Sequence, residues 1–403
     1  MISFSRLLCD IVGPGDYLRY GSAVNAERHD VAPRPVVVWN STRACNLNCI
    51  HCYASAASAP SAGEMTTDEG KAFIRDIAAF QAPVLMFSGG EPLLRPDFFY
   101  LAELAADLGL RLVLSTNGTL IDHAVATRLK QIGFSEIGIS LDGMEEMNDR
   151  FRGHKGAFKA ALNGIRHSLD NGLRVSLRFT ITRFNYTEVP AIFGLAEAED
   201  VGRICLYHLA FCGRGSNLIH ADLSAQETRR VVDTIIDLTR GLHTRGKPKE
   251  VLTVANHADG VYLYLKLLEQ DPQRAQAVQD LLRLNGGNSS GIRISCVDDE
   301  GCVHPDQFWQ PCSLGNIRQR PFSEIWADNS HPLLAGLRDR KSRLIGRCRE
   351  CRYLDLCNGN LRARAESIHD DVWASDPACY LSDSEIGANG ADTGHKLPSA
   401  TSL

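Results

Sequence analysis

Short apolar runs alternate with helical segments between residues 35 and 212. The runs are rich in β-branched residues and end at Gly, Pro or polar residues, which is typical of buried strands. They cover residues 35–42, 83–90, 110–118, 134–143, 173–182 and 202–211. Strands that alternate with helices in this way predict an α/β fold with a parallel sheet built by right-handed crossovers.

The pattern changes after residue 213. Two long helical segments are expected at 222–245 and 257–284, with a short VLTV run between them, and hairpins and loops follow. A Gly/Ser/Ala/Thr-rich end is expected to be disordered. We therefore divide the chain into an N-terminal extension (1–34), an α/β unit (35–215), a helical linker or insertion (216–290), a cysteine-rich domain (291–383) and a disordered tail (384–403).

Composition narrows the class of protein. The chain has 403 residues, is 44% hydrophobic and carries a net charge of −5, so no nucleic-acid surface is indicated. No run reaches the roughly 18–20 apolar residues of a membrane helix, and the N-terminus does not look like a signal peptide. Thirteen cysteines, an odd number, fit poorly with complete disulfide pairing. We expect a cytoplasmic protein, without membrane or nucleic-acid partners, whose cysteines are mainly metal ligands.

Three of these cysteines follow the first strand in the stretch TRACNLNCIHCYAS. Cys45, Cys49 and Cys52 are separated by three and then two residues. A closed zinc site or an ordinary iron–sulfur cluster takes four protein ligands, so one ligand is missing. A structural zinc knuckle that takes its fourth ligand from His51 or a distant cysteine is the alternative, although this spacing is unusual for zinc.

Short polar turns follow the next three strands. SGGEP contains Gly89, Gly90 and Glu91; glycines let backbone approach a ligand closely, and a carboxylate accepts hydrogen bonds from an ammonium group. STNG (115–118) and SLDG (140–143) follow in the same way. Each motif alone also fits a simple turn. Because parallel strands end at one edge of the sheet, a ligand site is expected there.

A second group of cysteines lies near the C-terminus. Cys348, Cys351, Cys357 and Cys379 have the spacing C-x₂-C-x₅-C, followed by a gap and the last cysteine. Four thiolates are a complete set for a [4Fe–4S] cluster or for a Cys₄ zinc site.

Together, the cysteine trio, SGGEP and the C-terminal cysteines resemble the radical S-adenosylmethionine (radical SAM) enzymes with a SPASM/twitch-like C-terminal domain. The resemblance implies a partial (β/α)₆ TIM-like barrel. It implies a [4Fe–4S] cluster held by the three cysteines and S-adenosylmethionine, and an auxiliary [4Fe–4S] cluster on the other four. The implied cofactor contacts are Gly89, Gly90, Glu91, Thr116, Asn117, Ser140, Asp142, Arg152 and Arg178.

The chain departs from the two-auxiliary-cluster pattern of that domain. Asp306 stands where a cysteine would follow Gly301, and the upstream stretch LNGGNSSGIRI holds none. We therefore expect one auxiliary cluster. The remaining cysteines are interpreted as buried structural thiols: Cys9, Cys205, Cys212, Cys296, Cys302 and Cys312.

Longer stretches resemble the tetrapyrrole-modifying members of the family. They are LRYG, LYHLAFCGRGS, NGGNSSG, HPDQFW, LGNIRQRPFSEIW and DPACYL. The implied reaction removes the two acetate side chains of 12,18-didecarboxysiroheme to give Fe-coproporphyrin III, within haem biosynthesis. Removal of propionates in haem d₁ biosynthesis is the near alternative. A peptide-modifying SPASM enzyme is less favoured, because about 34 residues before the first strand are few for a peptide-recognition module.

The resemblance also implies partners. They are an iron tetrapyrrole and a one-electron reductant such as a flavodoxin or ferredoxin-like protein. Arg214, Arg362 and Arg364 are candidates for the substrate carboxylates, and His208, His257 and His304 for an axial iron ligand. A two-cluster electron carrier or a zinc scaffold is the non-enzymatic alternative, but it leaves SGGEP, STNG and SLDG without a role.

Overall fold

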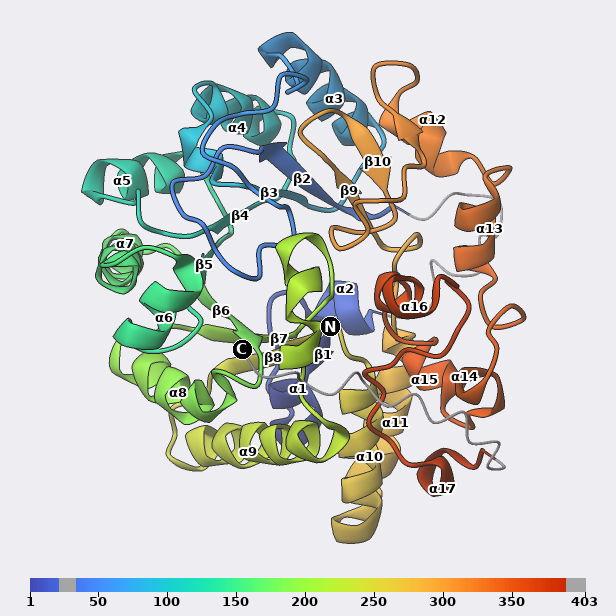
Figure 1. Cartoon of the computed structure of the whole chain (residues 1–403). Helices are drawn as coiled ribbons and strands as arrows, with labels where there is room; N and C mark the ends of the chain where they lie inside the picture. The colour runs from blue at the N-terminus through green and yellow to red at the C-terminus, as the bar shows by residue number, and fades with distance from the viewer. Residues whose placement is uncertain (22–33, 389–403) are drawn as a thin grey trace.

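A parallel sheet forms the centre of the protein. The computed structural model describes residues 1–21 and 34–388. Seven consecutive parallel strands are β2 (Val36–Thr42), β3 (Leu85–Gly89), β4 (Leu112–Thr116), β5 (Glu136–Ser140), β6 (Val175–Ile181), β7 (Arg203–His208) and β8 (Glu250–Val254). They curve around an interior that faces away from the helices (Figure 1). All six strands predicted from the apolar runs are present, so the α/β fold class is confirmed.

Helices connect the strands and cover the outside of the curved sheet (Figure 1). They are α3 (Thr67–Ala79), α4 (Phe98–Asp107), α5 (His123–Ile132), α6 (Glu145–Arg152), α7 (Ala157–Asp170), α8 (Val189–Ala198) and α9 (Ala225–Thr244). Local signals set their ends: Thr66 and Glu69 form a capping box on α3, and Gly133 ends α5 in the left-handed region.

The sheet is larger than the six-stranded expectation. The expectation of a helical segment over 216–290 misses β8, which lies between α9 and α10 (Ala258–Gln270). On the other edge, β9 (Ile294–Val297) runs parallel to β2, and β10 (Cys302–His304) and β11 (Gly315–Asn316) continue antiparallel. Within the described residues, the sheet is therefore mixed and has eleven strands.

Alternation along each strand separates the core from the interior of the barrel. On β3, Leu85 and Phe87 are fully buried under the helices, whereas Met86 and Ser88 face the interior. On β6, Arg178 and Thr180 face the interior in the same way. Polar side chains therefore reach the inside of the barrel without disturbing the apolar layer under the helices.

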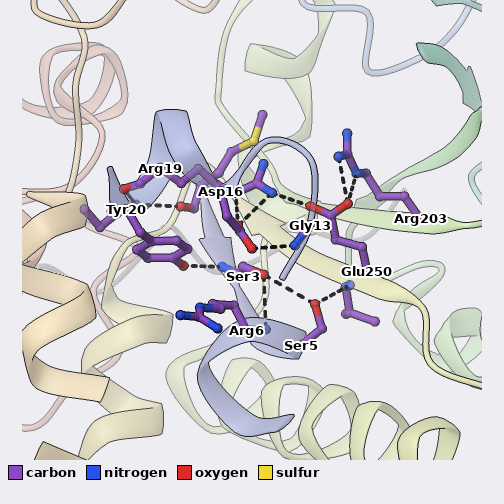
Figure 2. Close-up of polar contacts among 12 residues, drawn as sticks. Ser3, Ser5, Arg6, Gly13, Asp16, Arg19, Tyr20, Arg203 and Glu250 are labelled. Carbon is purple, nitrogen blue, oxygen red and sulfur yellow. Dashed lines mark hydrogen bonds and ion pairs between the residues drawn. The ribbon is translucent and has the colours of Figure 1, made fainter. Parts of the chain in front are cut away.

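The N-terminal extension closes the end of the barrel where the strands begin. It forms β1 (Ile2–Ser3), α1 (Phe4–Cys9) and α2 (Asp16–Tyr20), and β1 pairs antiparallel with β8. Figure 2 shows Arg19 and Arg203 reaching the Glu250 carboxylate from two sides. Gly13 passes so close that a Cβ there would lie 2.3 Å from Glu250 Oε1. The remainder of the predicted extension, apart from residue 34, lies outside the described residues.

The C-terminal third packs beside the barrel (Figure 1). Its helices are α10, α11 (Pro272–Asn285), α12 (Phe322–Ala327), α13 (Pro332–Arg338), α14 (Arg347–Glu350), α15 (Leu354–Cys357), α16 (Arg362–His369) and α17 (Asp383–Ile386). The Arg364 guanidinium donates to the carbonyls of Leu209 and Ala255, which follow β7 and β8, and so joins this part to the barrel.

Of the predicted tail, residues 384–388 are described and include most of α17; residues 389–403 lie outside the described residues. Within the described part of the chain, no helix is both long and apolar enough to cross a membrane.

Candidate functional site

The loop after β2 brings three thiols to the C-terminal end of the barrel. Cys45, Cys49 and Cys52 all line one cavity inside it. The Cys45 amide donates to the Ala57 carbonyl at 2.7 Å, which closes the loop. Arg214 holds it from the strand-end segment after β7, because its Nε donates to the Cys49 carbonyl at 2.8 Å and its Nη1 to the Ala56 carbonyl at 2.6 Å. The loop that carries the three cysteines is thus held by its own backbone hydrogen bond and by Arg214 from the segment after β7.

Burial disfavours free thiolates in this loop. It raises the pKa of Cys45 to about 11 and also raises the pKa of Cys49. Arg152 opposes this at Cys49, where its Nη1 lies 3.5 Å from the sulfur. Because a metal ligand must be deprotonated, a metal held by these thiols would have to supply the positive charge that stabilises the thiolates.

Asp142 organises the polar groups behind the loop. Its Oδ2 pairs with the Arg152 guanidinium and lies 3.1 Å from His51 Nε2, and its Oδ1 accepts from the Thr180 amide at 2.8 Å. Burial alone would raise the pKa of Asp142, but Arg152 and His51 outweigh it and lower that pKa to about 2. Asp142 is therefore an anion that orients Arg152 beside Cys49.

The glycines of SGGEP are required by a close backbone approach. A Cβ on Gly90 would lie 2.2 Å from the Ala44 carbonyl oxygen, and one on Gly89, whose φ is +122°, would lie 2.5 Å from that of Thr42. The amides of Gly90 and Glu91 donate to these same two carbonyls. Any larger residue would push the cysteine loop away from β3.

Glu91 faces the neighbouring STNG turn. Its fully buried carboxylate accepts from Thr116 Oγ1 at 2.8 Å and from the Asn117 amide at 2.9 Å. Burial dominates over these hydrogen bonds and raises the pKa of Glu91 to about 7. The Asn117 side chain in turn lies 3.9 Å from Cys45 Sγ and donates to Asn46. Strand ends β3 and β4 are thereby tied to the cysteine loop.

The cavity runs from the cysteine loop down the barrel interior and has a volume of about 430 Å³. Ser140 and Arg178 line it, together with Thr116, Asn117 and Arg152. Gly89 and Gly90 border it as well, whereas Glu91 and Asp142 support it from behind. Nearly all the residues expected at the cofactor thus share one cavity with the cysteine trio.

The four C-terminal cysteines surround a second, small cavity. Cys348, Cys351, Cys357 and Cys379 all line it, and its volume is about 30 Å³. Most of the remaining wall is apolar, and the polar residues Arg347, Asn360 and Ser375 also border it; the apolar side chains include Ala258, Val261, Leu381 and Ile386. Burial raises the pKa of Cys379 to about 12 and that of Cys357 well above its usual value. Within the described residues, no three His, Cys, Asp or Glu side chains converge on the position of one metal ion, so these thiols line a space instead of meeting at a point.

A polar network occupies the position where a further cluster would require cysteines. Asp306 accepts from Ser290 Oγ and, at 2.8 Å, from the Phe308 amide. Arg340 donates to Asn288 and to the Ser290 carbonyl. The other cysteines are dispersed: Cys296 is fully buried on β9, and Cys302 lies on β10.

Two of the arginines expected at the substrate have other partners. Arg364 is fully buried against Asp376, with Nε–Oδ1 at 2.7 Å, and Arg362 is fully buried and donates to three backbone carbonyls. We therefore assign neither to the substrate. Arg214, the third candidate, lines the cavity but supports the cysteine loop.

The three candidate histidines also have protein partners. His208 Nε2 lies 2.9 Å from Asp259 Oδ2, and His304 Nδ1 lies 2.6 Å from the Cys312 carbonyl. His257 is fully surrounded, and burial lowers its pKa well below the usual value. Of the three, His208 and His257 line the cavity.

Sequence reasoning missed the supports of the cysteine loop. Gly213 has φ +54°, and a Cβ there would lie 2.4 Å from the Tyr53 carbonyl oxygen, so the chain after β7 can approach the loop closely. Tyr53 donates to Asn40 Oδ1 and lies 2.7 Å from Ser88 Oγ. The glycines of CGRGS were the available signal for the first of these contacts.

Comparison with known proteins agrees with this architecture. Residues 39–196 match the model of the radical SAM superfamily, and residues 288–352 match that of the SPASM iron–sulfur cluster-binding domain. These matches imply [4Fe–4S] clusters and S-adenosylmethionine. Among solved structures, anSMEcpe with bound AdoMet superposes with a TM-score of 0.66 at 20% identity, over 86% of this chain and 93% of that one. Streptococcus suis SuiB gives 0.69 at 14% identity, over 89% and 78%. These two likenesses establish the fold.

Curated relatives are closer in sequence. An Fe-coproporphyrin III synthase of Methanosarcina barkeri is 53% identical over 96% of this chain and 99% of its own length. A pre-heme d1 synthase of Dinoroseobacter shibae is 43% identical over 88% of each chain, and an AdoMet-dependent heme synthase of M. barkeri is 34% identical over 86% and 96%. With three thiols on the loop after β2, a partial barrel behind them and four further thiols around a C-terminal cavity, the chain belongs to the radical SAM family and carries a SPASM domain.

Proposed function

We propose that this enzyme removes the two acetate side chains of 12,18-didecarboxysiroheme and yields Fe-coproporphyrin III. The observation that carries the proposal is the 53% identity, over nearly the whole of both chains, to a protein named for making that product. Removal of propionates, the chemistry of the haem d₁ branch, is the second candidate, because the pre-heme d1 synthase is 43% identical. Modification of a peptide is less favoured, because the mycofactocin maturase of Mycobacterium tuberculosis is only 29% identical.

We assign the first cluster to Cys45, Cys49 and Cys52. All three thiols border the same cavity, and the donor set leaves one iron without a protein ligand. The carbon–carbon bonds to be cleaved are unactivated, so acid–base groups alone would not suffice. S-adenosylmethionine bound at the open iron supplies the radical chemistry, and the protein supplies position and electrostatics.

The cofactor contacts follow from the cavity wall. Gly89, Gly90, Thr116 and Asn117 would approach the methionyl part, and Ser140 the ribose. Glu91 supports the methionyl end of the site by accepting hydrogen bonds from Thr116 and Asn117. Asp142 contributes by holding Arg152, whose guanidinium lies beside Cys49. A carboxylate of the cofactor that reaches Arg152 would thus meet a cation already oriented for it.

We assign one auxiliary [4Fe–4S] cluster to Cys348, Cys351, Cys357 and Cys379. Support comes from the cavity that these four thiols share and from its apolar wall. The Asp306–Ser290 contact supports the expectation of a single auxiliary cluster, because hydrogen-bonded oxygens fill the place of the missing cysteines. A flavodoxin or ferredoxin-like protein would supply the electron.

The test is anaerobic incubation of the reduced enzyme with S-adenosylmethionine and 12,18-didecarboxysiroheme, followed by mass analysis. Loss of two acetate equivalents, with methionine and 5′-deoxyadenosine formed, is the expected result. Loss of two propionate side chains would move the enzyme to the haem d₁ branch. An unchanged tetrapyrrole beside continued cleavage of S-adenosylmethionine would contradict both assignments.

A further inference from the structure

A cationic side chain in the middle of the barrel has no anionic partner. Arg178 lies on β6, level with Ser140 of β5 and Cys205 of β7, and lines the large cavity. Its Nη1 donates to Ser115 Oγ at 2.5 Å and lies 3.9 Å from Met86 Sδ, while its buried Nε has no hydrogen-bond partner. In the described part of the chain, no carboxylate lies within ion-pair distance of it, and Glu136 acts on its charge only from farther away.

Two other arginines of the same cavity, Arg152 and Arg203, are neutralised by carboxylates, whereas Arg111 and Arg214 border it without one and donate to neutral oxygens instead. Arg152 pairs with Asp142, and Arg203 pairs with Glu136 and Glu250. The acids that border the cavity are also committed, since Ser176 and Arg203 hold Glu136, and Ser290 and the Phe308 amide hold Asp306. Because this guanidinium has no ion-pair partner and its buried Nε has no hydrogen-bond partner, an anion entering from the cavity would stabilise Arg178.

The backbone makes room for this guanidinium. A Cβ on Gly138 of β5 would lie 2.1 Å from Arg178 Nε and 2.4 Å from its Cζ. The side chain therefore lies flat across β5 and reaches β4 and β3. Tyr207 of β7 also lines the cavity, and its hydroxyl has no protein partner among the described residues. A guanidinium with a hydroxyl nearby suits a carboxylate, which accepts several hydrogen bonds at once.

The depth of Arg178 in the barrel indicates whether it would bind a carboxylate of the substrate or the carboxylate of the cofactor. The cysteine loop follows the end of β2, and the cofactor must reach iron there. Arg178 is the middle residue of β6, and its contacts Ser115 and Met86 lie within β4 and β3 before their ends. The guanidinium lies over Gly138, two residues before Ser140 at the end of β5, so it faces the part of the cavity farther from the cysteine loop, which remains for the substrate.

We infer that Arg178, with Ser115 and Tyr207 beside it, anchors a carboxylate side chain of the tetrapyrrole substrate inside the barrel. The inference rests on the proposed function, which supplies a substrate with several carboxylates. Arg178 is then a specificity-determining residue that sets how the macrocycle sits relative to the cofactor. The methionyl carboxylate of S-adenosylmethionine is the other source of the same chemistry, and the experiment separates the two.

The experiment titrates anaerobic holoenzyme, without S-adenosylmethionine, with Fe-coproporphyrin III and with its tetramethyl ester, following the Soret band. Wild-type enzyme should bind the free acid more tightly than the ester. Arg178→Met should weaken binding of the acid by about 30-fold, the lower range for truncating one partner of a buried charge pair, and leave binding of the ester unchanged. Gly138→Ala keeps the charge but displaces the guanidinium, and should produce the same selective loss.

Arg111→Met is the matched control. Arg111 borders the same cavity but donates to Ser135 and Tyr17, so its removal should leave both titrations unchanged. A parallel titration with S-adenosylmethionine completes the set, and its affinity should not change in Arg178→Met.

Three results would overturn the inference, and they differ from one another. If Arg178→Met weakens binding of S-adenosylmethionine but not of the tetrapyrrole, the anchored carboxylate is the cofactor's. If neither affinity changes, Arg178 is purely structural. If wild-type enzyme binds neither tetrapyrrole, the proposed function fails and the inference fails with it.

Discussion

Two carboxylates near the cysteine loop are both fully buried but differ in how readily they ionise. Asp142 faces the Arg152 guanidinium and the His51 ring, and these two neighbours lower its pKa to about 2 despite burial. Glu91 has only neutral donors, so burial prevails and raises its pKa to about 7. The contrast follows from the nearest partner of each, because burial favours the neutral acid and a neighbouring cation favours the anion.

The raised pKa of Glu91 makes stability depend on pH. The folded state holds this proton more tightly than the unfolded chain, so the free energy of unfolding should fall as pH rises from 4.5 to about 7 and then level off. Between about pH 5.5 and about pH 8 the fall attributable to Glu91 is about 2 kcal/mol. Urea unfolding of wild type and Glu91→Gln at both pH values measures it. An equal pH dependence in the two proteins would contradict the prediction.

Gly90 should be intolerant of even one added carbon. In Gly90→Ala, the new Cβ would lie 2.2 Å from the Ala44 carbonyl oxygen, so the cysteine loop must move. Displacement on the order of 1 Å is expected to slow 5′-deoxyadenosine formation by about 100-fold. Gly194→Ala is the control, since a Cβ there meets nothing within 4 Å in the middle of α8. That change should stabilise the protein by about 0.5–1 kcal/mol and leave the rate unchanged.

Single residues were predictable where spacing carries the chemistry. The grouping of seven cysteines into three and four was predictable because thiol spacing is visible along the chain, and the structure places each group at its own cavity; that these thiols bind iron stays a prediction. Arg362 and Arg364 were misinterpreted, because a sequence does not show whether a guanidinium meets carbonyls of distant strands. Burial of Arg364 against Leu209 and Ala255 depends on contacts more than 100 residues away.

Among the elements, the two cysteine segments should hold iron independently. The trio lies on the loop after β2. Of the other four thiols, Cys348 and Cys357 belong to α14 and α15, Cys351 directly follows α14, and Cys379 lies between α16 and α17. The Cys45/Cys49/Cys52→Ala variant should retain about four irons per chain, against about eight in wild type, and form no 5′-deoxyadenosine. Iron and sulfide analysis measures this.

Cys9→Ser provides the matched control, because Cys9 borders neither cavity. It should keep the full iron content and the full rate. Zinc in place of iron in the triple variant would disprove the C-terminal assignment, and undiminished 5′-deoxyadenosine would disprove the first.

Strands were predictable where an apolar run is flanked by long helical segments on a regular spacing. β8 has five residues, as β3, β4 and β5 do, but it was not assigned to the sheet because the change of pattern after residue 213 was interpreted as the end of the α/β unit. β9 has four residues, and only pairing with β2 reveals it. Such strands are defined by their neighbours in space more than by their own sequence.

For the molecule as a whole, the cavity is closed by segments from both ends of the chain. Arg19 from the N-terminal extension pairs with Glu250 where the strands begin, and Phe308 and Leu361 from the SPASM part border the same cavity. Walls from both ends of the chain narrow the access of water and of stray hydrogen donors that would quench a radical. The barrel and the C-terminal part are thus both needed to form one site.

Breaking the buried pair Arg364–Asp376 should show whether the barrel and the C-terminal part unfold together. Both side chains are fully buried, and Arg364 also donates to carbonyls that follow β7 and β8. Asp376→Asn leaves a buried guanidinium without its counter-charge and should lower the free energy of unfolding by about 3–5 kcal/mol. Asp383→Asn breaks the exposed pair with Arg347 and should cost less than about 1 kcal/mol.

Denaturant unfolding of anaerobic holoenzyme, followed by circular dichroism and by iron–sulfur absorbance, measures both changes. Because Arg364 joins the barrel to the C-terminal part, the two signals should shift together in Asp376→Asn. A loss confined to the iron–sulfur signal, with the midpoint from circular dichroism unchanged, would show that the C-terminal part unfolds separately and would contradict the coupling. Equal destabilisation by Asp376→Asn and Asp383→Asn would show instead that burial does not set the cost of breaking the pair.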